Sequence, residues 1–343
     1  MNNHKELNSP GRISRRELLK CTLGGIAIGA AGVTLHRYYR RIEQKTATFI
    51  AKVPSYNANL SSVIEDGMRS LGLGPEEVRG KRILVKPNLV ETTSGAVHIC
   101  THPEVVRSTA EVLLKLGAEK VIVGEGSGHC RETASVAEEI GLSKILAENK
   151  IPFADLNTED FIIKTNAGGY NKLKTLAFPS IIEQVDWVVS IAKMKTHHWA
   201  GVTLSMKNLF GLMPGIVYGW PKNVFHCLGI NASILDINAT IRPHLAIVDG
   251  IVGMEGDGPI MGTPIHTGAI VMGRDPAAVD ATSARIMKIN PLKVRYLNEA
   301  CGWLGTVHEK NISQAGEPIK AVQHEFKLLD EIAAHKGLRL RVS

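Results

Sequence analysis

Residues 82–123 read RILVKPNLVETTSGAVHICTHPEVVRSTAEVLLKLGAEKVIV, and this stretch decides the fold. Its two ends, Arg82–Lys86 and Lys120–Val123, are short apolar runs typical of buried parallel strands. Between them an amphipathic stretch runs from Pro103 to Leu116, with the proline at the first helical position and a glycine just after its end. The stretch therefore predicts a strand–helix–strand unit with a right-handed crossover.

Similar runs occur along the rest of the body, residues 46–343. They are Thr46–Val53, Trp187–Ala192, Leu245–Val248 and Ala269–Met272. Alternation of such strands with helical patterns predicts an α/β fold, a mostly parallel sheet with helices on both faces, arranged in two lobes. The Gly-, Asn- and Lys-rich region 163–180 is expected to be a hairpin or the junction between the lobes.

Composition and charge exclude several classes of protein. The 343 residues are 44% hydrophobic and 21% charged, which is ordinary for a folded chain and excludes a disordered or polytopic membrane protein. Residues 1–45 hold nine of the 40 Lys and Arg but three of the 33 Asp and Glu, leaving 31 positive and 30 negative residues in the body. A nucleic-acid partner is therefore not expected, because the folded body carries no basic excess.

Residues 1–45 read as an export leader. Ser14-Arg15-Arg16-Glu17-Leu18-Leu19-Lys20 precedes an uncharged run, Cys21–Leu35, which is the pattern of a twin-arginine signal. We expect the twin-arginine translocase as a partner, a location in the periplasm or on the outer face of the cytoplasmic membrane, and membrane contact only through the leader. The leader is either cleaved or kept as an anchor.

The cysteines give no cluster spacing. Cys100, Cys130, Cys227 and Cys301 contain no Cys-x-x-Cys pair, so they are either buried free thiols or disulfide partners whose pairing the sequence leaves open. His98, Cys100 and His102 alternate along the chain, so they are either soft metal ligands on one side of an extended segment or residues that pack and cap the following helix.

Polar clusters follow four of the predicted strands. Ligands of open parallel sheets bind beyond the carboxyl ends of the strands, so these clusters are candidates for one site. They comprise Lys86 and Asn88; Glu125 and His129; Lys193, Lys195 and His197; and Asp249, Glu255 and Asp257.

Each cluster has more than one reading. A negative charge at Glu125 argues against a phosphate cradle in its glycine-rich loop. The lysines of the third cluster, with Lys207 and Asn208 nearby, hold a carboxylate or phosphate or are simply solvated. The acidic turn Asp249–Asp257 binds a hard cation or satisfies loop amides.

Several motifs in order resemble the family catalogued as domain of unknown function 362. They are Lys86-Pro87-Asn88-Leu89, Thr101-His102-Pro103-Glu104-Val105-Val106, Lys195-Thr196-His197, Lys207-Asn208-Leu209-Phe210-Gly211 and Asp275-Pro276-Ala277-Ala278-Val279-Asp280. The resemblance covers roughly residues 49–286. Some members of that family are labelled iron–sulfur proteins because they append a ferredoxin module, which this chain lacks.

A second segment is similar to nickel-pincer lactate racemases. It has the spacing His197-x3-Gly201-x5-Lys207, with His226 further on. The resemblance implies an acid/base role for His197, a covalent link between Lys207 and a nicotinate-derived cofactor, and a nickel ligand in His226. The chain departs from the racemases at Ser205-Met206, where they have two glycines.

Three functions remain open. The first is an exported enzyme that depends on a metal or organic cofactor and acts on a small anionic substrate in an isomerase or redox reaction, with His197, His129 and Lys207 catalytic. The second is an iron–sulfur or other metal redox protein, and the third is a binding protein without turnover. Ligand-binding residues would be Lys86, Asn88, Glu125, Lys193, Lys195 and Asn208, and metal ligands His226, Asp249, Glu255 and Asp257.

The leader generates the first testable prediction. Changing Arg15 and Arg16 together to lysine is expected to abolish export of a tagged protein, because the twin-arginine route reads the arginine pair rather than its charge alone. The measurement is the distribution of the tag between cytoplasm and periplasm. Unchanged export of the double variant would contradict the assignment.

Overall fold

The central strands send alternate side chains to opposite faces of one sheet. The computed structural model describes residues 45–91, 95–128 and 132–340. In β2 (Arg82–Lys86), Ile83 and Val85 belong to one hydrophobic core, whereas Leu84 belongs to the other. In β7 (Trp187–His197), Val189 and Ile191 join the first core and Ala192 the second. The strands are apolar throughout because both faces of the sheet are covered.

The strands of the described residues form a ten-stranded sheet in the order β12-β1-β11-β9-β7-β2-β3-β4, with β10 on β9 and β8 on β7. The run from β9 through β7, β2 and β3 to β4 is parallel, whereas β11 pairs antiparallel with both β9 and β1. The remaining strands of this sheet are β1 (Thr46–Lys52), β3 (Lys120–Glu125), β4 (Phe153–Asp155), β8 (Gly201–Thr203), β9 (Leu245–Glu255), β10 (Thr263–Ile265), β11 (Ala269–Gly273) and β12 (Ile312–Gly316).

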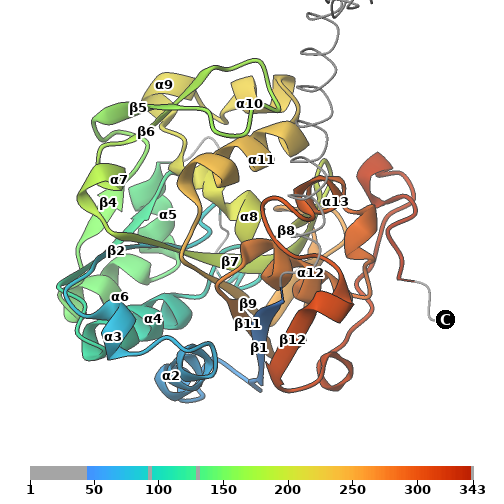
Figure 1. Ribbon diagram of the computed structural model, residues 1–343, viewed down its shortest axis with the longest axis horizontal. Helices are drawn as coiled ribbons and strands as arrows, with labels where there is room; N and C mark the ends of the chain where they lie inside the picture. The colour runs from blue at the N-terminus through green and yellow to red at the C-terminus, as the bar shows by residue number, and fades with distance from the viewer. Residues whose placement is uncertain (1–44, 92–94, 129–131, 341–343) are drawn as a thin grey trace, which may run out of the picture. The chain divides into compact units, whose positions relative to one another are not determined.

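Helices cover both faces of this sheet (Figure 1). One face packs against α2 (Leu60–Ser70), α4 (Pro103–Lys115), α5 (Thr133–Glu139) and α6 (Leu142–Glu148). The other face packs against α8 (Ser205–Asn208), α11 (Ile230–Ile241), α12 (Pro276–Ile286) and α13 (Arg295–Ala300). The predicted α/β class, with a mostly parallel sheet between helices, is confirmed.

Shorter elements complete the body. They are α3 (Pro75–Val78), α7 (Ile181–Gln184), α9 (Gly215–Tyr218), α10 (Asn223–Cys227) and the 3-10 turns Leu209–Leu212, Pro291–Lys293, Glu309–Asn311, Ile319–Ala321 and Ala333–His335. No helix among the described residues is both long and apolar enough to cross a membrane. The predicted leader lies outside the described residues except for Lys45.

Helix α4 begins and ends close to the predicted residues. The His102 Nδ1 accepts a hydrogen bond from the Glu104 amide at 3.2 Å, which caps the first turn, and Pro103 occupies the first helical position. The His102 ring also stacks on Tyr56 at 3.7 Å between centroids. His102 therefore caps and packs.

The region 163–180 forms a hairpin, which is one of the two arrangements expected for it. Strands β5 (Phe161–Thr165) and β6 (Thr175–Pro179) pair antiparallel as a separate two-stranded sheet. The carboxylate of Asp236 in α11 accepts hydrogen bonds from the amides of Tyr170 at 2.8 Å and Asn171 at 2.9 Å, which ties the hairpin loop to the main body. Residues from Lys45 onward cluster as one compact unit, and a division of this body into two lobes stays a prediction.

The two-sided core generates a stability prediction. Leu84→Ala removes a fully buried side chain from the middle of β2, so we expect the free energy of unfolding to fall by about 2–5 kcal/mol. Leu114→Ala on α4, where the side chain is 42% exposed, is the matched control and should cost under about 1 kcal/mol. Both are measured by urea denaturation, and equal losses would argue against this core.

Candidate functional site

A cavity of about 490 Å³ lies where the parallel strands β2, β3 and β7 end. This is the edge at which the sequence places its polar clusters, and the edge where open parallel sheets bind ligands. The side chains that line it include Asn88, Leu89, Glu125, Lys195, His197, His198, Trp199, Lys207, Asn208, Phe210, Lys222, His226, Asp257 and Met261.

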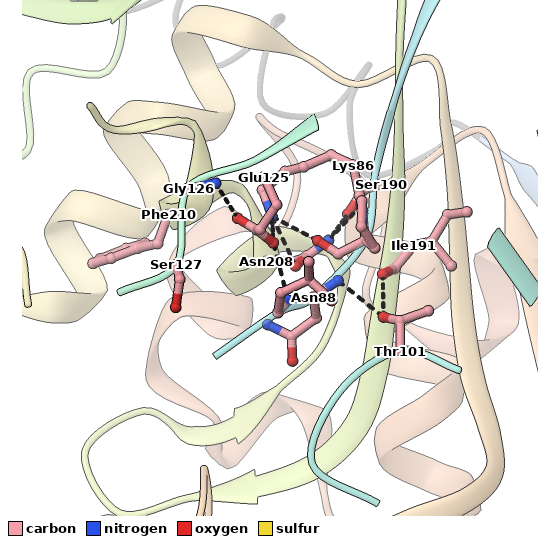
Figure 2. A network of polar contacts seen from close by, with 12 residues as sticks. Lys86, Asn88, Thr101, Glu125, Gly126, Ser127, Ser190, Ile191, Asn208 and Phe210 are labelled. Carbon is pink, nitrogen blue, oxygen red and sulfur yellow. Dashed lines mark hydrogen bonds and ion pairs between the residues drawn. The ribbon is translucent and has the colours of Figure 1, made fainter. Parts of the chain in front are cut away.

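A buried ion pair connects the ends of β2 and β3 beneath the cavity (Figure 2). The Lys86 Nζ lies 2.5 Å from the Glu125 Oε2 and 3.1 Å from the Asn208 Oδ1, and both charged side chains are almost completely buried. Glu125 also accepts hydrogen bonds from the amides of Leu89 at 3.1 Å and Gly126 at 2.9 Å. Both oxygens of Glu125 therefore accept hydrogen bonds within the protein.

Gly211 packs directly against this ion pair. A Cβ atom at position 211 would lie 1.7 Å from the Glu125 Oε1 and 2.5 Å from the Lys86 Nζ. Position 211 therefore requires glycine, which explains the end of the motif Lys207-Asn208-Leu209-Phe210-Gly211.

Asn88 is fixed beside the same strand ends. Its backbone amide donates to the Thr101 Oγ1 at 2.9 Å, and that hydroxyl donates to the Ile191 carbonyl at 2.8 Å (Figure 2). The Thr101 amide in turn donates to the Asn88 carbonyl at 2.9 Å. These bonds attach the segment after β2 to β7, so Asn88 takes a single position in the cavity wall.

Helix α8 brings Lys207 and Asn208 to the cavity. The Asn208 Nδ2 donates to the Lys86 carbonyl and to the Ser190 Oγ, both at 3.0 Å. At the other end of α8, the Asp280 carboxylate accepts from the amides of Ser205 at 2.8 Å and Met206 at 3.0 Å. Asp280 thus anchors the first turn through two orphan amides.

Lys207 is an amine without an ion-pair partner among the described residues. Its Nζ lies 4.1 Å from the centroid of the Phe210 ring, an arrangement in which the aromatic face stabilises the ammonium. Desolvation, reinforced by the charge of Lys86, lowers the pKa of Lys207 to about 8. The amine is therefore mostly charged at neutral pH and close to its titration range.

Two further lysines of the cavity are buried. The Lys195 Nζ donates to the carbonyls of Ile99 at 2.8 Å and Pro259 at 3.2 Å, and the Lys222 Nζ donates to the Gly126 carbonyl at 2.7 Å. Burial lowers the pKa of each to about 7. The sequence analysis missed Lys222, since a lysine after Trp-Pro carries no signal of burial.

His197 is a neutral imidazole with one nitrogen already used. Its Nδ1 accepts hydrogen bonds from the amides of Trp199 at 3.0 Å and Ala200 at 3.2 Å, so the ring proton resides on Nε2. Burial, with the charge of Lys207, holds the pKa of His197 well below its usual value. The Nε2–H group of His197 is therefore the hydrogen-bond donor that this side chain offers in the cavity.

His226 faces the same cavity beside Trp199, whose ring lies edge-on at 4.8 Å between centroids. Burial and the charge of Lys207 lower the pKa of His226 to about 4, so this ring is neutral as well. His198 pairs with Asp257 at 3.5 Å on the other side of Trp199. His197 and His226 therefore place no charge beside Lys207.

Lys195 lines the cavity, whereas Lys193, predicted to bind the same ligand, does not. The register between β7 and β9 shifts between Lys193, opposite Asp249, and Lys195, opposite Met254. The extra residues of this irregularity lie in β9, which advances from Asp249 to Met254 while β7 advances from Lys193 to Lys195. The Lys193 Nζ instead bonds Asp249 at 2.8 Å and the Tyr56 hydroxyl at 2.9 Å.

The residues predicted as metal ligands are not gathered. The carboxylate of Asp249 also accepts from the Tyr56 hydroxyl and the amides of His102 and Ile251, which leaves it no role as a cation ligand. Glu255 accepts from the Lys327 amide at 2.7 Å, away from the cavity, whereas Asp257 and His226 line it. No group of three or more His, Cys, Asp or Glu side chains within the described ranges could hold a metal ion.

The remaining predicted residues have separate positions. Cys100 is a buried free thiol, and Cys227 and Cys301 are also free. His98 does not form a ligand set with Cys100 and His102. His129 and Cys130 lie outside the described residues.

Comparison with known proteins agrees with the motifs that meet at the cavity. The family described as domain of unknown function (DUF362) matches residues 83–285, which include the ion pair, α8 and α12. This chain belongs to the DUF362 family. A curated relative, the thylakoid-associated protein sll1697 of Synechocystis sp., is 28% identical over 229 residues, 65% of this chain and 68% of that protein.

A solved structure is also similar to this DUF362 protein. It is a crystal structure of a protein from Thermotoga maritima, 15% identical with a TM-score of 0.40, and the match covers 66% of this chain and 58% of the other. The similarity to lactate racemases stays a prediction. The three residues that it concerns, His197, Lys207 and His226, all line the cavity. Among the described residues Lys207 has no carboxylate partner, so its amine is available to a cofactor bound in the cavity.

The buried ion pair generates the third prediction. Lys86→Met leaves Glu125 charged in the interior, so we expect the free energy of unfolding to fall by about 3–5 kcal/mol in urea denaturation. The double variant Lys86→Met/Glu125→Gln removes both charges and should recover a large part of that loss. If Lys86→Met alone is as stable as the native protein, the pair does not support the fold.

Proposed function

We propose that this protein binds a small anionic molecule in the strand-end cavity and exchanges a proton with it. The observation that carries the proposal is the amine of Lys207. It faces the cavity, rests against the Phe210 ring, and has no carboxylate partner among the described residues. A partly desolvated ammonium of this kind is completed by an anion from outside.

The charge balance of the cavity supports the same ligand class. Glu125 is neutralised by Lys86, and Asp257 is paired with His198 at the mouth. Lys195 and Lys222, which also line the cavity, add two further amines. A carboxylate or phosphate is therefore favoured over a cation, because the unpaired charge of these residues is positive.

Proton exchange falls to Lys207 rather than to His197. The His197 ring is held with its proton on Nε2, so it stabilises negative charge by donating a hydrogen bond and does not act as a base in this tautomer. Lys207, with a pKa of about 8, has both protonation states within reach near neutral pH. In this proposal the acid/base role predicted for His197 passes to Lys207.

The other predicted functions receive less support. An iron–sulfur or metal redox protein needs clustered ligands, and the described residues bring no such group together. A binding protein without turnover would use the same cavity and differ only in lacking proton exchange. An organic cofactor would also occupy this cavity, with Lys207 and His197 as its contacts. Export through the leader remains part of the proposal.

Anion binding and its pH dependence give the fourth prediction. Inorganic phosphate, lactate and succinate are the probes, and affinity is measured by isothermal titration calorimetry. Lys207→Met is expected to weaken binding about ten- to hundredfold, because it removes a charge-assisted hydrogen bond. Native affinity should hold below pH 8 and fall as the pH rises through about 8, where Lys207 loses its proton.

Lys144→Met is the matched control, since its side chain is 81% exposed on α6. It should bind the probes as the native protein does. Loss of the lactate or succinate proton next to the carboxylate in D2O, followed by NMR, separates an enzyme from a binding protein. Equal affinity of the native and Lys207→Met proteins for all three anions would refute the proposed site.

A further inference from the structure

We infer that the anion bound in this cavity is amphipathic, with its acidic group at Lys207 and a hydrocarbon part against the opposite, apolar side of the mouth. The inference rests on the proposed function and specifies its ligand class. Its basis is the juxtaposition, in one cavity, of an unpaired amine and a set of apolar side chains that are exposed to solvent.

The wall around Lys207 is mainly hydrocarbon and aromatic. Leu89 and Phe210 are buried in it, and Pro221 and Ile260 line it at intermediate depth. A site for a small hydrophilic acid such as phosphate would surround the anion with polar donors. This wall instead offers surface that gains free energy when hydrocarbon covers it.

The apolar surface continues outward onto the rim. Met261 is 78% exposed and Trp199 is 54% exposed, yet both line the cavity. Trp220 and Val224, which are 44% and 40% exposed, are close in the chain to Pro221 of the cavity wall. Single exposed apolar residues are ordinary, but a group beside a ligand cavity indicates a contact surface.

Hydrogen bonds hold this rim in place. The His198 amide donates to the Gly258 carbonyl at 2.9 Å, and the Lys195 Nζ donates to the Pro259 carbonyl at 3.2 Å. These bonds fasten the loop that carries Met261 to the end of β7. Trp199 is fixed through its amide, which donates to His197. The exposed side chains therefore stand on a preformed support, which limits the entropy lost when a ligand covers them.

Charge on the rim is small. Asp257 pairs with His198, and Glu91 lines the cavity on the side of Asn88. Apolar side chains at this rim, Trp199, Ile260 and Met261, line the same cavity as Lys207. This favours the tail of an acidic amphiphile over a polar extension of the ligand.

The test compares straight-chain acids of increasing length by calorimetry. Butyrate, hexanoate and octanoate are used below their micelle concentrations, with 1-octanol as the uncharged analogue. Each methylene that becomes buried should raise the affinity about fourfold, so we expect octanoate to bind at least tenfold more tightly than butyrate. Octanol should bind more weakly than octanoate.

Variants separate the two ends of the ligand. Met261→Glu should weaken octanoate about tenfold more than butyrate, because its charge acts on both acids while the lost apolar contact concerns octanoate alone. Lys207→Met should weaken both acids by a similar factor. Ile163→Glu, at a residue that is 59% exposed on β5, is the control and should change neither.

Outcomes that overturn the inference differ from those that overturn the function. Equal affinities for butyrate and octanoate, octanol binding as tightly as octanoate, or a chain-length gain that survives in Met261→Glu would each refute the amphipathic ligand while leaving anion binding intact. Absence of binding by every acid, phosphate included, would refute the proposed function itself.

Discussion

The ion pair between Lys86 and Glu125 is the interaction on which the site depends. It joins the ends of two parallel strands, and through Asn208 it also fixes helix α8. Either charge would be costly to bury alone, so loss of one partner or of the amide donors would destabilise the buried site. Because Lys207 precedes Asn208 in the same short helix, the contact between Asn208 and Lys86 also positions Lys207 in the cavity.

That pair also determines the electrostatics above it. Lys86 pairs with Glu125, and among the described residues no ion pair joins a carboxylate to Lys207. Burial then lowers the pKa values of Lys195, Lys207 and Lys222 to between about 7 and 8. Three amines that titrate within one pH unit interact with one another, so the charge of the cavity responds to a bound anion as well as to pH.

Much of the fold follows from the sequence because buried strands need apolar residues on both faces. The runs at Arg82–Lys86 and Lys120–Val123 and the helix that begins at Pro103 appear where predicted. The position of Glu125 and His197 near one edge follows from the topology of parallel strands alone. The hairpin at 163–180 was one of two alternatives, and its attachment through Asp236 depends on a contact distant in sequence.

The site was predicted less completely, for physical reasons. Lys193 looked available for a ligand because its partner Asp249 is distant in the chain, so the sequence gives no sign of their ion pair. Asp249 looked available because its partners Tyr56 and Lys193 lie far away in the chain. Asp280 was part of a quoted motif, but its role at α8 requires tertiary structure.

The close packing of Gly211 has a consequence for how this cavity can change. A side chain there would collide with Glu125 and Lys86, so a residue larger than glycine is not accommodated beside the ion pair. The mouth is different, since Trp199, Pro221 and Met261 belong to loops in which other side chains would fit. Diversity of ligands among proteins with this arrangement would therefore arise at the mouth, with the chemistry beneath it kept constant.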